Sequence, residues 1–255
     1  MRPIDVASRE TTEFVQRHLP PGTCRILEVG CGSGEVAARL QRVGHQVIAI
    51  DSDTNAIEQA RRLGIDARVA QWPDIPGVNE RAFDAILFAR SLHHISPLAS
   101  AVARAHDLLK PTGLLLVEDF AYDDMDLPTS EWCYSIAVLL KVCGTLLPEK
   151  AFLTAFVESG GDFAFWHQHH DHELHSAPAI LGALTHTFPL VAESEIAYLY
   201  RYFLPVLPET ELGHTVAAHL VDLEKRMGSV GNVQLIGRQF VARKQTPEIA
   251  PDSVR

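Results

Sequence analysis

The stretch ILEVGCGSG, residues 26–34, determines how the rest of the chain is interpreted. Its first residues favour a buried strand, and glycine follows at the alternate positions Gly30, Gly32 and Gly34 before helical spacing resumes. Glycine permits turn dihedrals that other residues avoid, and its missing Cβ leaves room for a ligand beside the backbone. A strand, a glycine turn and a helix in this order are typical of the ligand-binding edge of an open α/β sheet.

Working outward, the first half of the chain alternates between apolar runs and helical spacing. Strands are expected at 25–29, 46–50, 66–70, 83–89 and 114–118, with helices at 6–19, 36–43, 55–63 and 97–110. Asp53 or Thr54 can cap the third of these helices, and Ser96 with Pro97 is expected to open the fourth. Continuous apolar strands that alternate with helices predict a parallel sheet covered on both faces.

The second half is less regular. Helices are expected at 129–144, 148–159, 176–187 and 208–227, and β-forming residues predict strands at 194–203 and 233–244. If the His-rich stretch at 167–175 is extended, His170 and His172 share one face with Trp166, while His167 and His169 share the other. Two histidines and a carboxylate could hold a metal ion, but without a framing motif a pocket wall or a solvated edge is preferred and no metal is expected.

The bulk composition narrows the function classes. The chain has 255 residues, of which 47% are hydrophobic and 21% charged, so a sizeable core is expected. A net charge of −10 argues against a phosphate-backbone partner, so nucleic acid is not expected. No apolar stretch approaches the ~18 residues of a membrane span, and the charged start lacks a signal-peptide core. Four cysteines without a C-x-x-C pair indicate reduced thiols, so we expect a cytoplasmic protein that binds no membrane.

The glycine spacing and the nearby acids indicate the ligand. A dinucleotide site favours G-x-G-x-x-G, whereas here the third glycine comes one residue early and Glu35 follows it. Carboxylates at Glu28 and Glu35 would oppose a diphosphate but suit a cation with an ammonium and a sulfonium, which describes S-adenosylmethionine. Asp51, at the end of the second strand, can accept two hydrogen bonds from a ribose. The same contact serves NAD, and a helix cap or loop carboxylate is the alternative for Asp51.

Five segments in this order and spacing resemble the class I S-adenosylmethionine-dependent methyltransferases, from about residue 25 to 120. The resemblance implies an α/β, Rossmann-like three-layer sandwich with a mostly parallel seven-stranded sheet, whose last hairpin is antiparallel, and extra lid helices. It also implies a single domain at 1–244, with a cofactor-binding core at 22–120, a variable lid and acceptor region at 121–193, terminal strands at 194–244 and a tail at 245–255. The segments are EVGCGSG (28–34), ID (50–51), FDAI (83–86), LHHI (92–95) and LLKPTG (108–113).

Carried over by position, the resemblance places the methionine part of the cofactor at the glycine turn and the ribose at Asp51. Where the family often has an acid near the adenine, this chain has Gln71, which can accept the same hydrogen bond, and Trp72, which either stacks on the purine or packs in the core. The segment after the fourth strand meets the methionine end. The full expected set is Glu28, Gly30, Cys31, Gly32, Gly34, Asp51, Ser52, Gln71, Trp72, Ala89 and Arg90.

Methyl transfer from a sulfonium mainly requires alignment, and a general base is needed only when the nucleophile arrives protonated. His93 and His94, just after the fourth strand, are the candidate catalytic residues. The alternative is that one packs under the cofactor loop while the other caps a helix start. Glu118, Asp119 and Tyr122 end the fifth strand and are expected at the same rim, as substrate contacts or as loop-closing polar groups.

The expected function is S-adenosylmethionine-dependent methyl transfer to O, N or C of a small organic acceptor. A nonmethylating protein that binds the cofactor stays open, as does a nicotinamide-dependent oxidoreductase, although the glycine spacing and Glu35 speak against the latter. ARSL at 89–92 differs from an N-P-P-Y motif, which weakens DNA bases and glutamine amides as acceptors. The expected partners are a small-molecule acceptor and, as an open alternative, a second copy in a homodimer.

Overall fold

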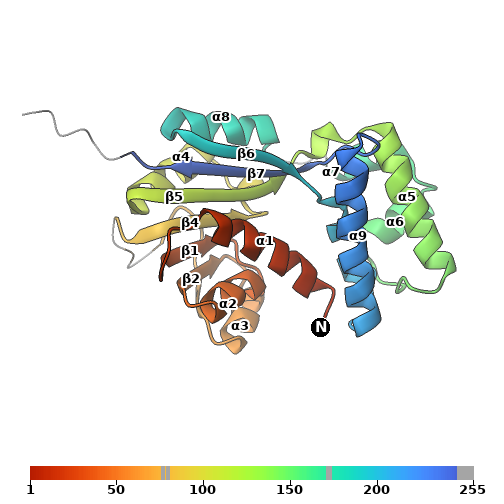
Figure 1. The fold of residues 1–255 in the computed structure, drawn as a ribbon, viewed down its shortest axis with the longest axis horizontal. Coiled ribbons are helices and arrows are strands. Elements are labelled where there is room, and N and C mark those ends of the chain that lie inside the picture. The colour runs from red at the N-terminus through yellow and green to blue at the C-terminus, as the bar shows by residue number, and fades with distance from the viewer. Residues whose placement is uncertain (76–77, 79–80, 171–173, 246–255) are drawn as a thin grey trace, which may run out of the picture.

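A computed structural model of the chain describes residues 1–75, 78, 81–170 and 174–245. Helices and strands alternate through the first half, and helices predominate in the second (Figure 1). The helices are α1 (Ile4–His18), α2 (Glu35–Arg42), α3 (Thr54–Arg62), α4 (Leu98–Leu108), α5 (Leu127–Val142), α6 (Phe152–Glu158), α7 (Phe163–His170), α8 (Ala177–Thr187) and α9 (Glu211–Ser229), with short 3₁₀ turns η1 (Leu92–His94), η2 (Tyr122–Asp124), η3 (Leu199–Tyr202) and η4 (Leu204–Val206). The strands are β1 (Arg25–Val29), β2 (Gln46–Asp51), β3 (Asp66–Val69), β4 (Phe83–Ala89), β5 (Leu109–Phe120), β6 (Leu190–Ile196) and β7 (Gly237–Arg243).

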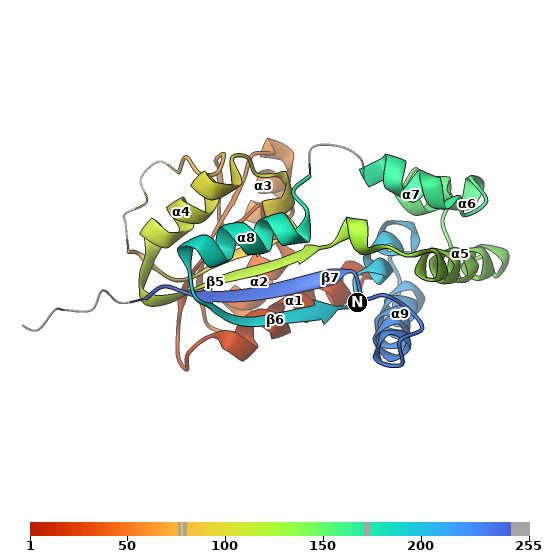
Figure 2. The same cartoon turned by 90° about the horizontal axis from the view of Figure 1, so that it is seen from above.

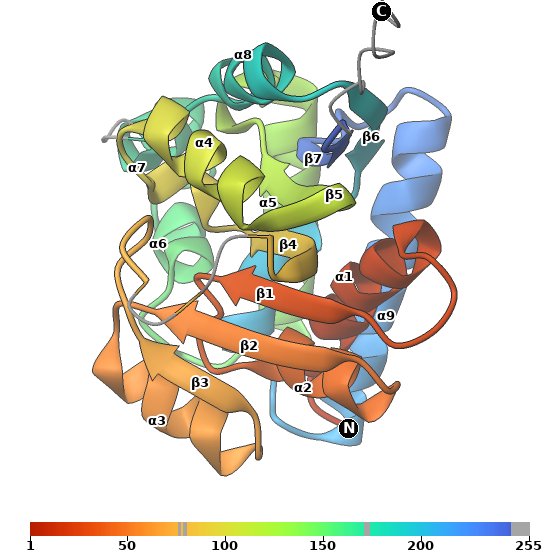
Figure 3. The same cartoon turned by 90° about the vertical axis from the view of Figure 1, so that its left-hand side faces the viewer.

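Within the described residues, seven strands form one sheet in the order β3-β2-β1-β4-β5-β7-β6. Strands β1 to β5 run parallel, and β7 lies antiparallel between β5 and β6. Figure 3 shows β3, β2, β1, β4 and β5 side by side. The expected seven-stranded sheet with an antiparallel last hairpin is therefore confirmed. The chain leaves β1 toward β2 on one side and later returns to β4 on the other, so the glycine turn lies at the switch point where open α/β sheets bind ligands.

Side chains that alternate along the strands build a core on each face of the sheet. In β1, Ile26 packs among residues of α1, α2 and α3, whereas Leu27 and Val29 pack among residues of α4 and α8. Each of these three side chains is at most 2% exposed, as parallel strands covered on both faces require. The three-layer arrangement follows directly from this alternation.

A further helical cluster lies beyond one end of the sheet, where Figures 1 and 2 show α5, α6, α7 and α9 gathered together. Phe120, at the carboxyl end of β5, belongs to this cluster, together with Trp166 of α7, Leu220 of α9 and Phe203 between η3 and η4. The cluster therefore stands at the edge where the parallel strands end, which is the edge of the glycine turn.

The predicted strand at 194–203 is wrong in its second half. The strand β6 ends at Ile196, and residues 199–202 form the turn η3. The backbone N–H groups of Tyr198, Leu199 and Tyr200 donate to the carboxylate of Glu224, at 2.6, 2.9 and 3.0 Å. The β-forming tyrosines thus bond to a side chain of α9 instead of a neighbouring strand.

The His-rich stretch is not extended in its first part, residues 167–170. Residues 163–170 form α7, in which the Asp162 side chain accepts from the Ala164 N–H at 3.0 Å. Trp166 and His170, four positions apart, lie on one buried face of this helix. They do not show the period of two that an extended segment would have. His172 lies outside the described residues.

Two helix starts differ from the predictions as well. Helix α4 begins at Leu98 with Pro97 at its N-cap and without a side-chain cap, because the Ser96 hydroxyl lies 2.9 Å from His175 Nε2. Helix α6 begins only at Phe152, whereas the sequence predicts a start at 148.

Among the described residues, no helix combines the length and the apolar character that crossing a membrane requires.

Candidate functional site

The glycine turn after β1 is tied to the end of β2. The backbone N–H groups of Gly30 and Cys31 both donate to the carbonyl of Ile50, at 2.8 and 3.0 Å. Gly30, Gly32 and Gly34 have φ angles of +72°, +52° and +84°, in the left-handed region that residues with a side chain rarely adopt. The turn therefore needs glycine for its backbone path alone.

Asp51 lies directly beside this turn. Its Oδ2 accepts from the Gly32 N–H at 2.8 Å, and its Oδ1 accepts from the Asp53 N–H at 2.9 Å. Each carboxylate oxygen keeps further lone-pair capacity, so both can also accept hydrogen bonds from a ligand. Asp53 caps α3 by accepting from the Asn55 N–H, so capping is the role of Asp53 and not of Asp51.

The space around each glycine distinguishes the glycines that close packing requires from the one that leaves room for a ligand. A Cβ at Gly30 would lie 2.4 Å from the Ser91 Cβ, and one at Gly34 would lie 2.8 Å from the Ala60 Cβ. A Cβ at Gly32 would meet no described atom within 4 Å. Close packing therefore requires Gly30 and Gly34, whereas Gly32 borders open space in which a ligand can approach the backbone.

Two cavities flank the turn, and the same three residues, Gly30, Asp51 and Arg90, line both. The larger, of about 480 Å³, also includes Ser52, Gln71, Trp72, Ser91 and His94 in its lining. The smaller, of about 220 Å³, includes Glu28, Cys31, Gly32, Glu35 and Ala89, together with Ile4 and Ser8 of α1. The two cavities adjoin at these three residues and are together called the groove, with a nucleoside-sized part and a narrower part on either side of the turn.

Glu28 occupies the narrow part in an unusual state. Its side chain is buried, and its Oε2 makes no hydrogen bond with any described residue. Burial raises the pKa of Glu28 to about 8, although the positive charge of Arg90 opposes the shift. A buried acid with an unbonded oxygen, in the narrow part of the groove, fits the ammonium end of an amino acid.

The residues expected near the adenine differ in their surroundings. Gln71 is exposed and lines the larger cavity, as a hydrogen-bonding residue should. Trp72 is 6% exposed, donates from Nε1 to the Ala101 carbonyl at 3.1 Å and packs edge-on against Phe88. Its indole is thus part of the core, and its contribution to the groove is apolar wall.

The two candidate histidines have different environments. His93 is 5% exposed, and its Nδ1 lies 2.5 Å from Asp119 Oδ1. Asp119 also accepts from the backbone N–H groups of His93 and Phe120, so it acts as the acceptor and the Nδ1 carries the proton. His94 is exposed, lines the larger cavity and packs its ring 4.0 Å from that of His93. Neither histidine caps α4.

The acids that end β5 do not lie at the rim as expected. Glu118 and Asp119 are both fully buried, Asp119 against His93 and Glu118 within a network of its own. Tyr122 is half-buried, and its carbonyl accepts from Trp166 Nε1 at 2.9 Å. The strand β5 lies inside the sheet, between β4 and β7, and its carboxyl end is buried. A polar side chain there can therefore only face a partner inside the protein.

Among the described residues, no group of three His, Cys, Asp or Glu side chains is arranged to hold a metal ion. His170 instead bonds within the protein, with Nδ1 2.8 Å from the Trp166 carbonyl and Nε2 2.8 Å from the Tyr202 hydroxyl. Both ring nitrogens of His170 are therefore engaged by other groups of the protein.

The sheet order, the glycine turn at the switch point and the adjoining carboxylate define the class I S-adenosylmethionine-dependent methyltransferase fold. Residues 5–177 match the family described as methyltransferase domain, and the chain belongs to this family. S-adenosylmethionine is its cofactor. The residues present fit that molecule: Asp51 faces the turn, Gly32 borders open space, and the narrow part of the groove contains acids and one guanidinium.

The chain is similar to curated proteins over a little less than half of its length. A ubiquinone biosynthesis O-methyltransferase of Xanthomonas axonopodis pv. citri is 30% identical over 122 residues, which span 46% of this chain and 51% of the relative. An uncharacterized methyltransferase of Mycobacterium bovis is 35% identical over 111 residues, which span 40% of this chain and 53% of the relative. The chain thus spans about half the length of the curated relatives it matches.

Solved structures extend the likeness in fold to nearly the whole chain. The cyclase SpnF superposes with a TM-score of 0.58 at 19% identity, covering 94% of this chain and 81% of the other. Geranyl diphosphate C-methyltransferase from Streptomyces coelicolor, in a complex containing S-adenosyl-L-homocysteine, gives a TM-score of 0.55 at 17% identity, covering 92% and 76%. These similarities show the fold.

Proposed function

We propose that the chain is an active methyltransferase that moves the methyl group of S-adenosylmethionine to O, N or C of a small organic acceptor. One observation carries the proposal: the Asp51 carboxylate, which lines both cavities, is bonded to the Gly32 N–H of the glycine turn between them. A nucleoside fits the larger cavity and an amino-acid tail fits the smaller one. When bound, the cofactor supplies an electrophilic methyl group on a positively charged sulfur.

The work of the chain is to align the acceptor with that methyl group and to exclude water. Asp51 and Gln71 orient the nucleoside, and the glycine turn holds the region between the two cavities. We propose that the acceptor enters from the side of the helical cluster, so that segment 121–193 contacts it. In support, Phe120 at the end of β5 joins that cluster, and His175, just before α8, donates its N–H to the His93 carbonyl at 2.9 Å.

A hydroxyl oxygen is the acceptor atom that we favour. The curated relatives include O-methyltransferases, and a hydroxyl must lose its proton as it reacts. His94 lines the groove and can take that proton. His93, fixed by Asp119, positions the His94 ring.

This assignment is tested by the pH dependence of kcat. His94→Gln should lower kcat by about 10²- to 10⁴-fold and abolish the rise in rate near neutral pH, because the proton acceptor is gone. His93→Gln should lower kcat but keep a rise with pH, since His94 is misplaced and not lost. An unchanged profile in His94→Gln would exclude that residue as the base.

The cofactor is tested by calorimetry with S-adenosylhomocysteine and with NADH. We expect binding of the first and not of the second. Transfer of isotope from methyl-labelled cofactor into a panel of phenols, amines and acids, and into cell extract, then tests the reaction. Binding of NADH alone would overturn the assignment.

A nonmethylating protein that binds the cofactor is the second candidate, since a structure described as a cyclase shares the fold. Retention of all the label on the cofactor in every panel and extract, despite tight binding, would favour this candidate over methyl transfer.

A further inference from the structure

Three tyrosines alternate along η3 and the residue before it, and their hydroxyls have different surroundings. The Tyr202 hydroxyl lies 2.8 Å from His170 Nε2, and the Tyr200 hydroxyl is sealed from solvent without a hydrogen bond to any described residue. The Tyr198 hydroxyl also makes no hydrogen bond with a described residue, but it keeps contact with solvent, although the residue is only 7% exposed. Because a buried tyrosine usually bonds its hydroxyl, one that is unbonded and accessible indicates a ligand contact.

Tyr198 is fixed through both its backbone and its ring. Its N–H donates to the carboxylate of Glu224 at 2.6 Å. Its ring stacks on that of Phe120, with 4.7 Å between the ring centres and 5° between the ring planes. The accessible hydroxyl is therefore held in one position, so a ligand that bonds to it does not have to order the side chain first.

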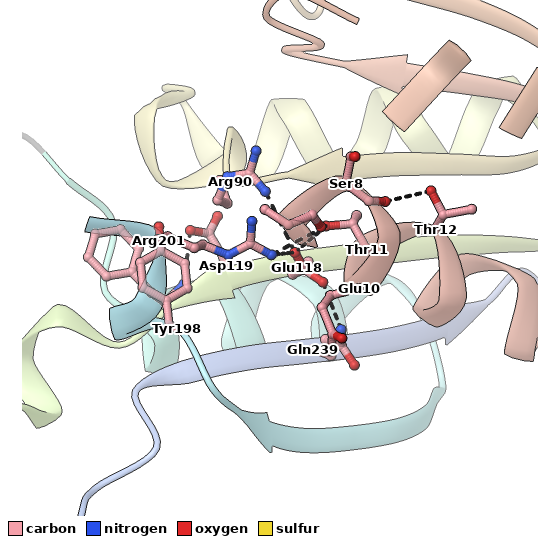
Figure 4. A network of polar contacts seen from close by, with 12 residues as sticks. Ser8, Glu10, Thr11, Thr12, Arg90, Glu118, Asp119, Tyr198, Arg201 and Gln239 are labelled. Carbon is pink, nitrogen blue, oxygen red and sulfur yellow. Dashed lines mark hydrogen bonds and ion pairs between the residues drawn. The ribbon is translucent and has the colours of Figure 1, made fainter. Parts of the chain in front are cut away.

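Two guanidinium groups lie near Tyr198. Arg201 Cζ lies 5.6 Å from the centre of the Tyr198 ring, and Arg201 Nη2 donates to Glu118 Oε1 at 2.6 Å. Figure 4 shows Tyr198 beside Arg201 in the network around Glu118, with Arg90 close by. Burial raises the pKa of the Tyr198 hydroxyl against the positive charge of Arg90, so the hydroxyl stays protonated at neutral pH and can donate a hydrogen bond.

Tyr198 lies where the groove meets the helical cluster. Its ring belongs to the core of that cluster, whereas Arg90, whose charge acts on its hydroxyl, lines both cavities of the groove. The ring of Phe120 also packs edge-on against that of His93, at 5.2 Å between the ring centres, and His93 adjoins His94. Three successive ring contacts thus connect Tyr198 with the candidate base.

We propose that the Tyr198 hydroxyl contacts the acceptor and donates a hydrogen bond to an oxygen other than the one that is methylated. This inference rests on the proposed function for the place of the acceptor and for its reacting hydroxyl. The rings of Phe120 and Tyr198 favour a flat aromatic body, and the two guanidinium charges favour an oxygen with negative charge. The acceptor class that fits is a phenol with a second, electron-rich oxygen.

Matched probes isolate this hydrogen bond. The 2-, 3- and 4-hydroxyacetophenones have a carbonyl group where the corresponding ethylphenols have a methylene group. In calorimetry on the protein saturated with S-adenosylhomocysteine, at least one hydroxyacetophenone should bind about 3- to 10-fold more tightly than its ethylphenol, as one hydrogen bond predicts. Tyr198→Phe removes the hydroxyl and keeps the ring, so it should reduce this difference to less than about twofold.

Tyr200→Phe is the matched control, because it removes a hydroxyl of the same turn that is sealed from solvent. This variant should keep both the wild-type difference between the probes and the wild-type affinity for S-adenosylhomocysteine. Absence of probe binding, absence of a preference for the carbonyl in the wild type, or an equal loss in both variants would overturn the proposal.

The affinity for the cofactor product separates two roles of the hydroxyl. Tyr198→Phe should bind S-adenosylhomocysteine as the wild type does, and a weakened affinity would assign the hydroxyl to the cofactor and overturn the proposal. The probe comparison measures binding alone. If the wild type transfers no methyl group to any acceptor, the proposed function fails, whereas the Tyr198 comparison still decides whether this hydroxyl recognises an oxygen of a phenol.

Discussion

At the scale of single residues, Asp51 performs two tasks with one carboxylate. It fixes the glycine turn through the Gly32 N–H and leaves lone pairs toward the groove. Its position was predictable because parallel strands end at the same edge of a sheet, so the ends of β1 and β2 must be neighbours. The residues around Glu118 were not predictable as a network, since Arg201 and Gln239 lie 83 and 121 positions away in the chain and no local pattern connects them.

Asp51→Asn should weaken the binding of S-adenosylhomocysteine by about 10- to 100-fold, because an amide presents an N–H where one of the backbone donors now points. Calorimetry measures the affinity. Asp66→Asn, an exposed acid at the start of β3, is the control and should bind as the wild type does. An Asp51→Asn protein that binds normally would remove this residue from the site.

Glu28 predicts a pH dependence of stability. Its folded-state pKa, about 8, lies above the ordinary value near 4.5, so between these pH values the folded protein holds a proton that the unfolded chain has released. The free energy of unfolding should therefore fall as pH rises from about 4.5 toward 8, and this contribution should level off above. Urea unfolding at pH 5.5 and 8.5 should show a smaller difference in Glu28→Gln than in the wild type. An identical difference in both proteins would mean that Glu28 is not the titrating group.

At the scale of elements, the periodic helices and the apolar strands of the first half followed from local sequence. The end of β6 did not, because the tyrosines at 198, 200 and 202 have the alternation of a strand. Their backbone is captured by Glu224, which lies on α9 and is fully buried. A tertiary contact of this kind overrides local preference.

Glu224→Gln should lower the free energy of unfolding by about 1–3 kcal/mol, because the amide can accept from only part of the three N–H groups and leaves a buried donor unpaired. Chemical denaturation measures the change. Asp222→Asn, exposed on the same helix, should have an effect within about 0.5 kcal/mol. Equal effects of the two substitutions would contradict the role of Glu224.

At the scale of the whole molecule, the family match ends at residue 177 and the curated relative of Xanthomonas axonopodis pv. citri overlaps only 46% of the chain. The cofactor half has motifs whose spacing follows from turn geometry, and its fold could be predicted from sequence. The helical cluster has no such motifs, because packing between α5, α6, α7 and α9 fixes it. The molecule therefore combines a half whose fold could be predicted from sequence with a helical cluster that only the structure describes.

The first helix covers the narrow part of the groove with Ile4 and Ser8, and partly exposed ion pairs hold its start against α2. Arg39 bonds to the Ser8 hydroxyl at 2.7 Å and pairs with Asp5 at 3.7 Å, and Arg2 lies 3.9 Å from Glu35. Dissolved salt weakens the attraction between charged side chains that solvent reaches. Stopped-flow measurement should show faster dissociation of S-adenosylhomocysteine at 0.5 M than at 0.05 M NaCl, and Arg39→Gln should reduce the difference. Equal dissociation rates at both salt concentrations would show that these pairs do not control release.

Because this helix borders the narrow part of the groove, the ionic strength of the surroundings can set how long the spent cofactor stays bound. A few charged side chains outside the site would then control the rate of turnover without contacting the reacting atoms.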